Sequence, residues 1–139
     1  MSQPAGYPGT PLPQKLGIGD GDAVALIGAP EWLEDLIAEV PSVAQVHTHL
    51  DGGTLFDVLV AFVSWRAELE AELGRLRDRM APACRLWIAW PKRASKVPTD
   101  MSDNVVREVA LPAGLVDIKV CAIDQSWSAL CLVIRREHR

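Results

Sequence analysis

The segment DAVALIGAPEWLEDLIAEV, residues 22–40, joins a strand signal directly to a helix signal. Residues 22–30 are apolar almost throughout, which is typical of a strand that is covered on both faces. After a turn that contains Gly28 and Pro30, apolar side chains recur at helical spacing until Pro41 ends the pattern. A buried strand that passes into an amphipathic helix predicts an α/β fold.

The same alternation continues along the chain. We expect strands at 42–50, 56–63, 84–90, 116–123 and 129–135, and helices from Ser64 to about Met80 and over 101–111. The long helix has an apolar stripe, and Glu68 and Glu72 belong to its solvent-facing side. The pattern predicts a three-layer open α/β sandwich, whose mainly parallel sheet of about six strands ends in an antiparallel C-terminal hairpin. This order of elements is similar to a shortened methyltransferase-type Rossmann fold.

The chain divides into an arm and one domain. Residues 1–14 contain four prolines and two glycines, which predicts an extended arm, and residues 15–139 form a single α/β domain. The first residues have neither the basic start nor the apolar core of a signal peptide. No apolar run approaches the roughly 18 residues of a membrane span. We therefore expect a cytoplasmic protein without a membrane partner.

Charge is distributed unevenly along the sequence. Residues 1–72 hold eleven acids and two bases, a net charge of −9, whereas residues 73–139 hold seven acids and twelve bases, a net charge of +5. Oppositely charged surfaces on one domain favour self-association, and we expect a homo-oligomer, most simply a dimer. A nucleic-acid binder is usually basic over the whole domain, so no nucleic-acid partner is expected.

The turn after the first strand is the expected place for a nucleotide-like ligand. Its sequence, LIGAPEW, has Gly28 but lacks the second and third glycines of a dinucleotide fingerprint. Asp51 follows Gly28 by 23 residues, at the position where such folds carry a ribose-binding acid. Asp51 also suits a simple turn in the sequence LDGG, and this alternative stays open.

A basic loop is the second candidate site. WPKRASKVPTD, residues 90–100, brings Lys92, Arg93 and Lys96 to the carboxyl end of a strand, ahead of a helix start near Thr99. Cations and free helix N–H groups at this edge of the sheet predict an anion or nucleotide site at Lys92, Lys96 and Thr99. The alternative is a solvated loop that only caps the helix, and Asp100 and Asp103 would oppose an anion.

Histidine and cysteine offer weaker candidates. On a strand, His47, His49 and Asp51 would project to one side and provide zinc-type ligands, but a further ligand is missing, and we expect no metal. The three cysteines are odd in number and lie in apolar surroundings, which favours free thiols. A bridge between Cys121 and Cys131 across the hairpin is the less favoured alternative.

Three motifs carry a family resemblance: GTPLPQKLGI at 9–18, WPKRASKVPTD at 90–100 and GLVDIKVCAIDQSWS at 114–128. They resemble a family of short bacterial proteins catalogued only as a domain of unknown function. The resemblance brings no activity or cofactor. It implies that the arm packs against the domain through Leu12, Leu16 and Ile18. In that family the helix after the basic loop runs on, whereas Pro112 should shorten it here.

The sequence favours a non-enzymatic interaction or regulatory module that self-associates, needs no cofactor and presents the loop 91–100 to a protein partner. The absence of a glycine fingerprint and of a nucleophile motif supports this interpretation. The alternative is a degenerate Rossmann-like binder or enzyme for a nucleotide-like or phosphate-bearing ligand.

Overall fold

The computed structural model describes residues 11–40, 43, 45–50 and 52–136, and these form one six-stranded sheet with helices on both faces. Its elements in chain order are α1 (Leu12–Lys15), β1 (Ala23–Ile27), α2 (Glu31–Ala38), β2 (Gln45–His47), β3 (Phe56–Phe62), α3 (Arg66–Asp78), β4 (Met80–Pro91), the 3-10 turn η1 (Arg93–Ser95), α4 (Asp103–Ala110), the 3-10 turn η2 (Leu111–Ala113), β5 (Leu115–Ala122) and β6 (Trp127–Ile134).

The strand order is β2-β1-β3-β4-β6-β5. The first four strands in this order are mutually parallel, and β6 runs antiparallel to both β4 and β5. The sequence-based prediction of a mainly parallel, Rossmann-like sheet with an antiparallel C-terminal hairpin is therefore confirmed. β3 and β4 are the innermost parallel strands, and β3 and the second half of β4 are almost completely buried, which explains the continuous apolar sequences there.

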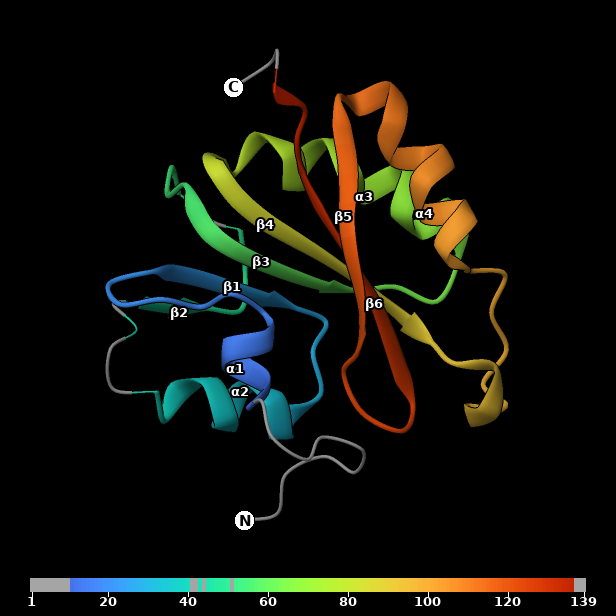
Figure 1. The fold of residues 1–139 in the computed structure, drawn as a ribbon, viewed down its shortest axis with the longest axis horizontal. Coiled ribbons are helices and arrows are strands. Elements are labelled where there is room, and N and C mark those ends of the chain that lie inside the picture. The colour runs from blue at the N-terminus through green and yellow to red at the C-terminus, as the bar shows by residue number, and fades with distance from the viewer. Residues whose placement is uncertain (1–10, 41–42, 44, 51, 137–139) are drawn as a thin grey trace.

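Helices cover both faces of the sheet (Figure 1), and the buried apolar side chains form two separate core layers. On one face α3 and α4 pack over the sheet through side chains such as Leu69 and Val106. On the other face α1 and α2 bury Leu16, Leu33 and Ile37 against the strands. Alternation along β3 and β4 divides their side chains between the two layers, as a strand buried on both faces requires.

The segment 12–15 is helical, whereas the proline content predicts an extended arm to residue 14. The described part of this arm forms a short helix because its prolines, Pro11 and Pro13, lie at the helix start, where no amide donor is needed. Residues 1–10 lie outside the described residues. Leu12 and Leu16 are buried and Ile18 packs against the same core, at the positions that the family resemblance implies.

A buried hydrogen bond fixes this segment to the sheet. The indole N–H of Trp87 on β4 donates to the carbonyl oxygen of Leu16, with an Nε1–O distance of 2.9 Å. Trp87 has no exposed surface, so the bond satisfies two polar groups that water does not reach.

The connection between β2 and β3 positions the candidate site. Residues 48–50 and 52–55 belong to this connection, and Leu50 enters the core layer that α3 covers. No helix occurs in the described residues of this connection, although parallel strands are usually joined by one. At the end of β1 the loop residue Leu50 consequently lies beside side chains of α3.

Cys84 and Cys131 are buried, Cys121 is half-buried, and all three are free thiols. In the paired hairpin strands Cys121 lies opposite Ala129, and Cys131 lies opposite Lys119, so the two sulfurs do not face each other. Within the part of the chain that the structure describes, no helix is both long and apolar enough to cross a membrane.

Candidate functional site

A cavity of about 330 Å³ opens where three parallel strands end, and we call it the strand-end cavity. Ile27 and Gly28 come from the end of β1, Thr48 follows β2, and Ala61 and Phe62 close β3. The volume lies within the usual range of small-molecule sites, about 300 to 1,000 Å³.

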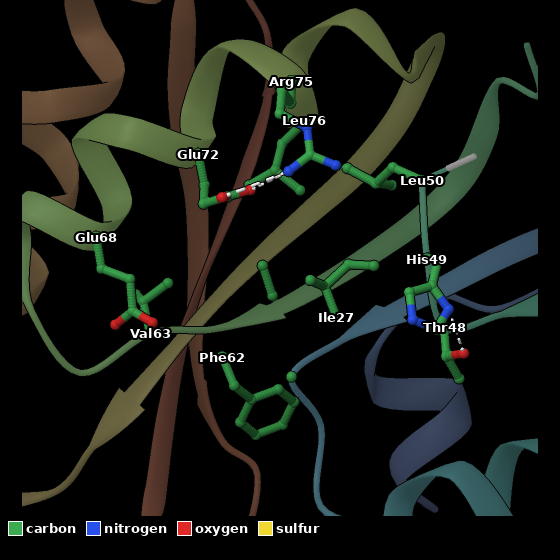
Figure 2. A pocket seen from close by; sticks show the side chains of 12 residues that line it. Ile27, Thr48, His49, Leu50, Phe62, Val63, Glu68, Glu72, Arg75 and Leu76 are labelled. Carbon is green, nitrogen blue, oxygen red and sulfur yellow. Dashed lines mark hydrogen bonds and ion pairs between the residues drawn. The ribbon is translucent and has the colours of Figure 1, made fainter. Parts of the chain in front are cut away.

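Charged side chains line one wall of this cavity and loop residues line the other (Figure 2). Glu68, Glu72 and Arg75 project from α3, and His49 and Leu50 lie opposite them. The strand residues between these walls are apolar. The cavity therefore combines an apolar base with ionic groups on one side, which is the usual composition of a ligand site.

The chain changes direction at this place in the sheet. β1 connects to β2 through α2 on one face, and β3 connects to β4 through α3 on the other face. The neighbouring strands β1 and β3 thus send their helices to opposite faces, and a crevice opens between their carboxyl ends. Ligands of open α/β sheets bind at such a switch point.

The two carboxylates of the cavity have different partners. The Oε1 atom of Glu68 accepts hydrogen bonds from the backbone N–H groups of Ser64, at 2.8 Å, and Trp65, at 3.4 Å. Glu72 forms an ion pair with Arg75, with an oxygen–nitrogen distance of 3.0 Å. Two carboxylates face one guanidinium, so negative charge is in excess on this wall.

Gly28 lies where the turn after β1 passes close to the backbone at the end of β3. Its φ is +68°, and a Cβ atom at this position would lie 3.3 Å from the carbonyl oxygen of Phe62. A side chain here would be strained and would crowd the end of β3. The single glycine of LIGAPEW thus fits the conformation of the turn, although the two further fingerprint glycines are missing.

The sequence-predicted site residues do not gather in one place. Gly28 lines the strand-end cavity, and Asp51 lies outside the described residues. Lys92 and Thr99 line a second cavity of about 740 Å³ beyond β4, which we call the loop cavity. Lys96 belongs to the lining of neither cavity. The combined anion or nucleotide site of Lys92, Lys96, Thr99, Gly28 and Asp51 stays a prediction, and the structure divides its described members.

Thr99 and Asp100 hold the basic loop against the start of α3. The hydroxyl of Thr99 donates to the carbonyl oxygen of Ser64 and accepts from the N–H of Met101. A carboxylate oxygen of Asp100 accepts from the N–H of Arg66 at 2.7 Å, and so caps α3. The carboxylates of Asp100 and Glu68 therefore satisfy backbone N–H groups at the start of α3. The helix after the loop begins at Asp103, capped by Ser102, and not near Thr99.

The histidines have separate surroundings. β2 ends at His47, so the strand alternation that would bring His47 and His49 to one side does not continue. His47 contacts Gln45 at 2.7 Å and packs edge-on against Phe56, whereas His49 contacts Thr48 at 3.1 Å. Among the described residues, no group of three or more histidine, cysteine or acidic side chains is placed to hold a metal ion.

Sequence reasoning missed the carboxylates of the cavity. Glu68 and Glu72 are one helical turn apart and were expected to face solvent, because they lie opposite the apolar stripe of α3. The missing information was the short connection 48–55, which leaves room beside this side of the helix. A spacing of only five residues between the expected strands 42–50 and 56–63 was the one available signal.

No protein-family model and no curated protein matches the chain, so the resemblance to a bacterial domain of unknown function stays a prediction. Solved structures do match. Magnesium protoporphyrin IX methyltransferase from Synechocystis PCC 6803 aligns with a TM-score of 0.60 at 11% identity, over 88% of this chain and 74% of that one. An O-methyltransferase from neocarzinostatin biosynthesis aligns with a TM-score of 0.62 at 13% identity, over 81% and 48%. The tRNA methyltransferase TrmK of B. subtilis gives 0.58 at 13%, over 90% and 66%.

At these identities the comparison establishes the methyltransferase-like Rossmann fold. The interpretation of the chain as a non-enzymatic interaction module is contradicted by this comparison, because the three similar structures named above are methyltransferases, two of them with S-adenosylmethionine bound. The alternative from the sequence, a Rossmann-like binder or enzyme for a nucleotide-like ligand, fits better. The expected dimer and the protein partner at the loop 91–100 stay predictions.

Proposed function

We propose that this protein is a methyltransferase-like enzyme that binds S-adenosylmethionine in the strand-end cavity. The observation that carries the proposal is the position of the cavity, at the carboxyl ends of β1, β2 and β3 and at the switch point of the sheet. The methyltransferase-like fold supports the same ligand class.

The charge around the cavity favours an adenosyl ligand without phosphates. The first turn of α2, where a dinucleotide would place its pyrophosphate, carries Glu31 and Glu34. These carboxylates repel phosphate, and Glu68 and Glu72 add negative charge across the cavity. S-adenosylmethionine bears a sulfonium and an ammonium group, so an excess of carboxylates stabilises it.

The lining residues fit the parts of such a ligand. Ile27, Leu50 and Phe62 provide apolar surface for an adenine ring, and the carboxylate of Glu72 can accept hydrogen bonds from ribose hydroxyls or the ammonium group. Gly28 lets the ligand approach the backbone. Asp51, next to Leu50 in the chain, lies outside the described residues, and its role as a ribose-binding acid stays a prediction beside that of a simple turn residue. The bound ligand would supply a methyl group activated by the positive sulfur.

Calorimetric titration of the purified protein with three ligands tests the proposal. S-adenosylmethionine should bind more tightly than its uncharged thioether product, S-adenosylhomocysteine, and both should bind more tightly than ADP, whose phosphates meet the acids of α2. Absence of heat with both adenosyl ligands, or tighter binding of ADP, would contradict the proposal.

Glu72→Gln should weaken the binding of S-adenosylmethionine about tenfold or more, because a charge-assisted hydrogen bond in the site is lost. Glu70→Gln is the matched control. It removes the same charge from α3 and breaks one exposed ion pair, Arg66–Glu70, as Glu72→Gln breaks Arg75–Glu72. The free energy of unfolding of both variants should lie within about 0.5 kcal/mol of that of the parent, since exposed ion pairs contribute little to stability. If both variants had the same affinity for S-adenosylmethionine, Glu72 would not contact the ligand.

A further inference from the structure

The loop cavity has the features of a second binding site. It lies beyond the carboxyl end of β4, between the loop that follows this strand and the start of α4, and has a volume of about 740 Å³. It shares no lining residue with the strand-end cavity. Both cavities lie at the carboxyl ends of strands, and these ends are on the same side of the sheet because β3 and β4 are parallel neighbours.

Its base is apolar and close to fully buried. Trp90 and Met101 each expose only 7% of their surface, and both line the cavity together with Pro91. A ligand that rests on an indole ring and a thioether gains by burying an apolar body of its own.

The acidic side chains of the cavity have hydrogen-bond or ion-pair partners, whereas its two basic side chains have none in the described part of the chain. Asp100 is bound by the N–H of Arg66, and Asp103 forms an ion pair with Arg107, with an oxygen–nitrogen distance of 3.1 Å. In contrast, neither Lys92 nor Arg93 has a side-chain hydrogen bond or ion pair with another described residue. Each of the two acids that should oppose an anion therefore already has a partner, although Arg107 also pairs with Asp117, whereas the two cations are available to contact a ligand.

The position of the loop cavity links it to the strand-end cavity. The N–H of Val63, which lines the strand-end cavity, donates to the carbonyl oxygen of Ala89 at 2.9 Å, one residue before Trp90. The bond from Thr99 to Ser64 holds the far side of the loop against the same strand end. Hydrogen bonds between neighbouring segments consequently join the linings of the two cavities.

We propose that the loop cavity binds the methyl acceptor, a small organic anion whose carboxylate or phosphate contacts Lys92 and Arg93 and whose apolar body packs on Trp90 and Met101. The acceptor role rests on the proposed function, whereas the anion site stands independently of it. In the transfer, a lone pair of the acceptor forms the new bond to carbon. The carbon–sulfur bond breaks with its electron pair going to sulfur, and the acceptor proton passes to solvent.

The test uses 3-phenylpropionate as the anionic probe and its neutral amide, 3-phenylpropionamide, as the isosteric control. In two-dimensional ¹H–¹⁵N spectra of the full chain at low salt, the carboxylate should shift the Trp90 indole signal and the backbone signals of Lys92 and Ser128. The amide should bind about tenfold more weakly. Phenyl phosphate, titrated in parallel, distinguishes a phosphate-bearing acceptor from a carboxylate. Shifts of equal affinity for acid and amide, or shifts located elsewhere, would overturn the proposal.

Variants separate the cations of the site from general basicity. Lys92→Gln and Arg93→Gln should each weaken the binding of 3-phenylpropionate about tenfold. Arg136→Gln removes the same charge two residues after the C-terminal end of β6. Because β6 runs antiparallel to β4, this position lies at the end of the sheet away from the loop cavity, and the variant should leave the affinity unchanged. If all three variants lost the same affinity for 3-phenylpropionate, the binding would be a nonspecific attraction to positive charge, which would overturn the proposal.

Because the probe is titrated without an adenosyl ligand, the two proposals fail separately. Binding of 3-phenylpropionate without binding of S-adenosylmethionine would retain the anion site and reject its acceptor role. The reverse result would retain the proposed function and reject the loop cavity as the acceptor site.

Discussion

Replacing Trp87 by phenylalanine should lower the free energy of unfolding by about 2–4 kcal/mol. The indole N–H that satisfies the carbonyl oxygen of Leu16 disappears, and that oxygen stays buried without a donor. The smaller ring also leaves a cavity between the sheet and α1. Urea unfolding followed by far-ultraviolet circular dichroism measures the change.

Trp65→Phe is the control for this experiment. Trp65 precedes α3 and exposes 48% of its surface, so its replacement should change the stability by no more than about 0.5 kcal/mol. If Trp87→Phe were as stable as Trp65→Phe, the segment 12–18 would not be anchored through the indole.

Raising the pH from 8 to 10.5 should destabilise the protein by about 4–6 kcal/mol through two thiols, Cys84 and Cys131. Burial raises the pKa of each of these thiols to about 12, and the nearby charge of Asp57 adds to the effect at Cys84. In the unfolded chain a thiol has a pKa of about 8.5. The native state therefore holds these protons more tightly. Its advantage is complete below about pH 8.5 and is lost as the pH rises toward 12.

The double variant Cys84→Ala, Cys131→Ala isolates this contribution. Lysine and tyrosine titrate in both proteins, so the difference between the two pH profiles belongs to the thiols. The variant should begin less stable at pH 8, because two buried sulfurs are removed, and should then lose less stability with pH. Parallel profiles of urea midpoint against pH would contradict the prediction.

The fold was predictable because its signals are local. The apolar strands at 22–30 and 56–63 and the amphipathic helix that begins near Ser64 indicate their structures without knowledge of any long-range contact. The C-terminal hairpin is likewise set by two strands and a short polar turn. The helix at 12–15 was missed because proline density indicates an extended segment unless the prolines fall at a helix start.

The site was predictable only in part, because its residues are brought together by connections and not by motifs. Gly28 was identified from its place after β1. Glu72 was not, since the space that it lines depends on the connection from β2 to β3, whose described residues contain no helix. In the basic loop, sequence showed the cations but not that Asp100 is engaged by α3 and Asp103 by Arg107. Those pairings leave Lys92 and Arg93 as the charged side chains of the loop cavity that have no side-chain partner among the described residues.

The hydrogen bond between Trp87 and Leu16 joins residues 71 positions apart, and this has a consequence for synthesis on the ribosome. At typical rates of about 5–20 residues per second, Leu16 is made roughly 4–14 seconds before its partner. During that interval the apolar face of α1 has no completed sheet to cover. Nascent chains that stop before β4 should therefore be recognised by chaperones and proteases, and those that include it should become resistant.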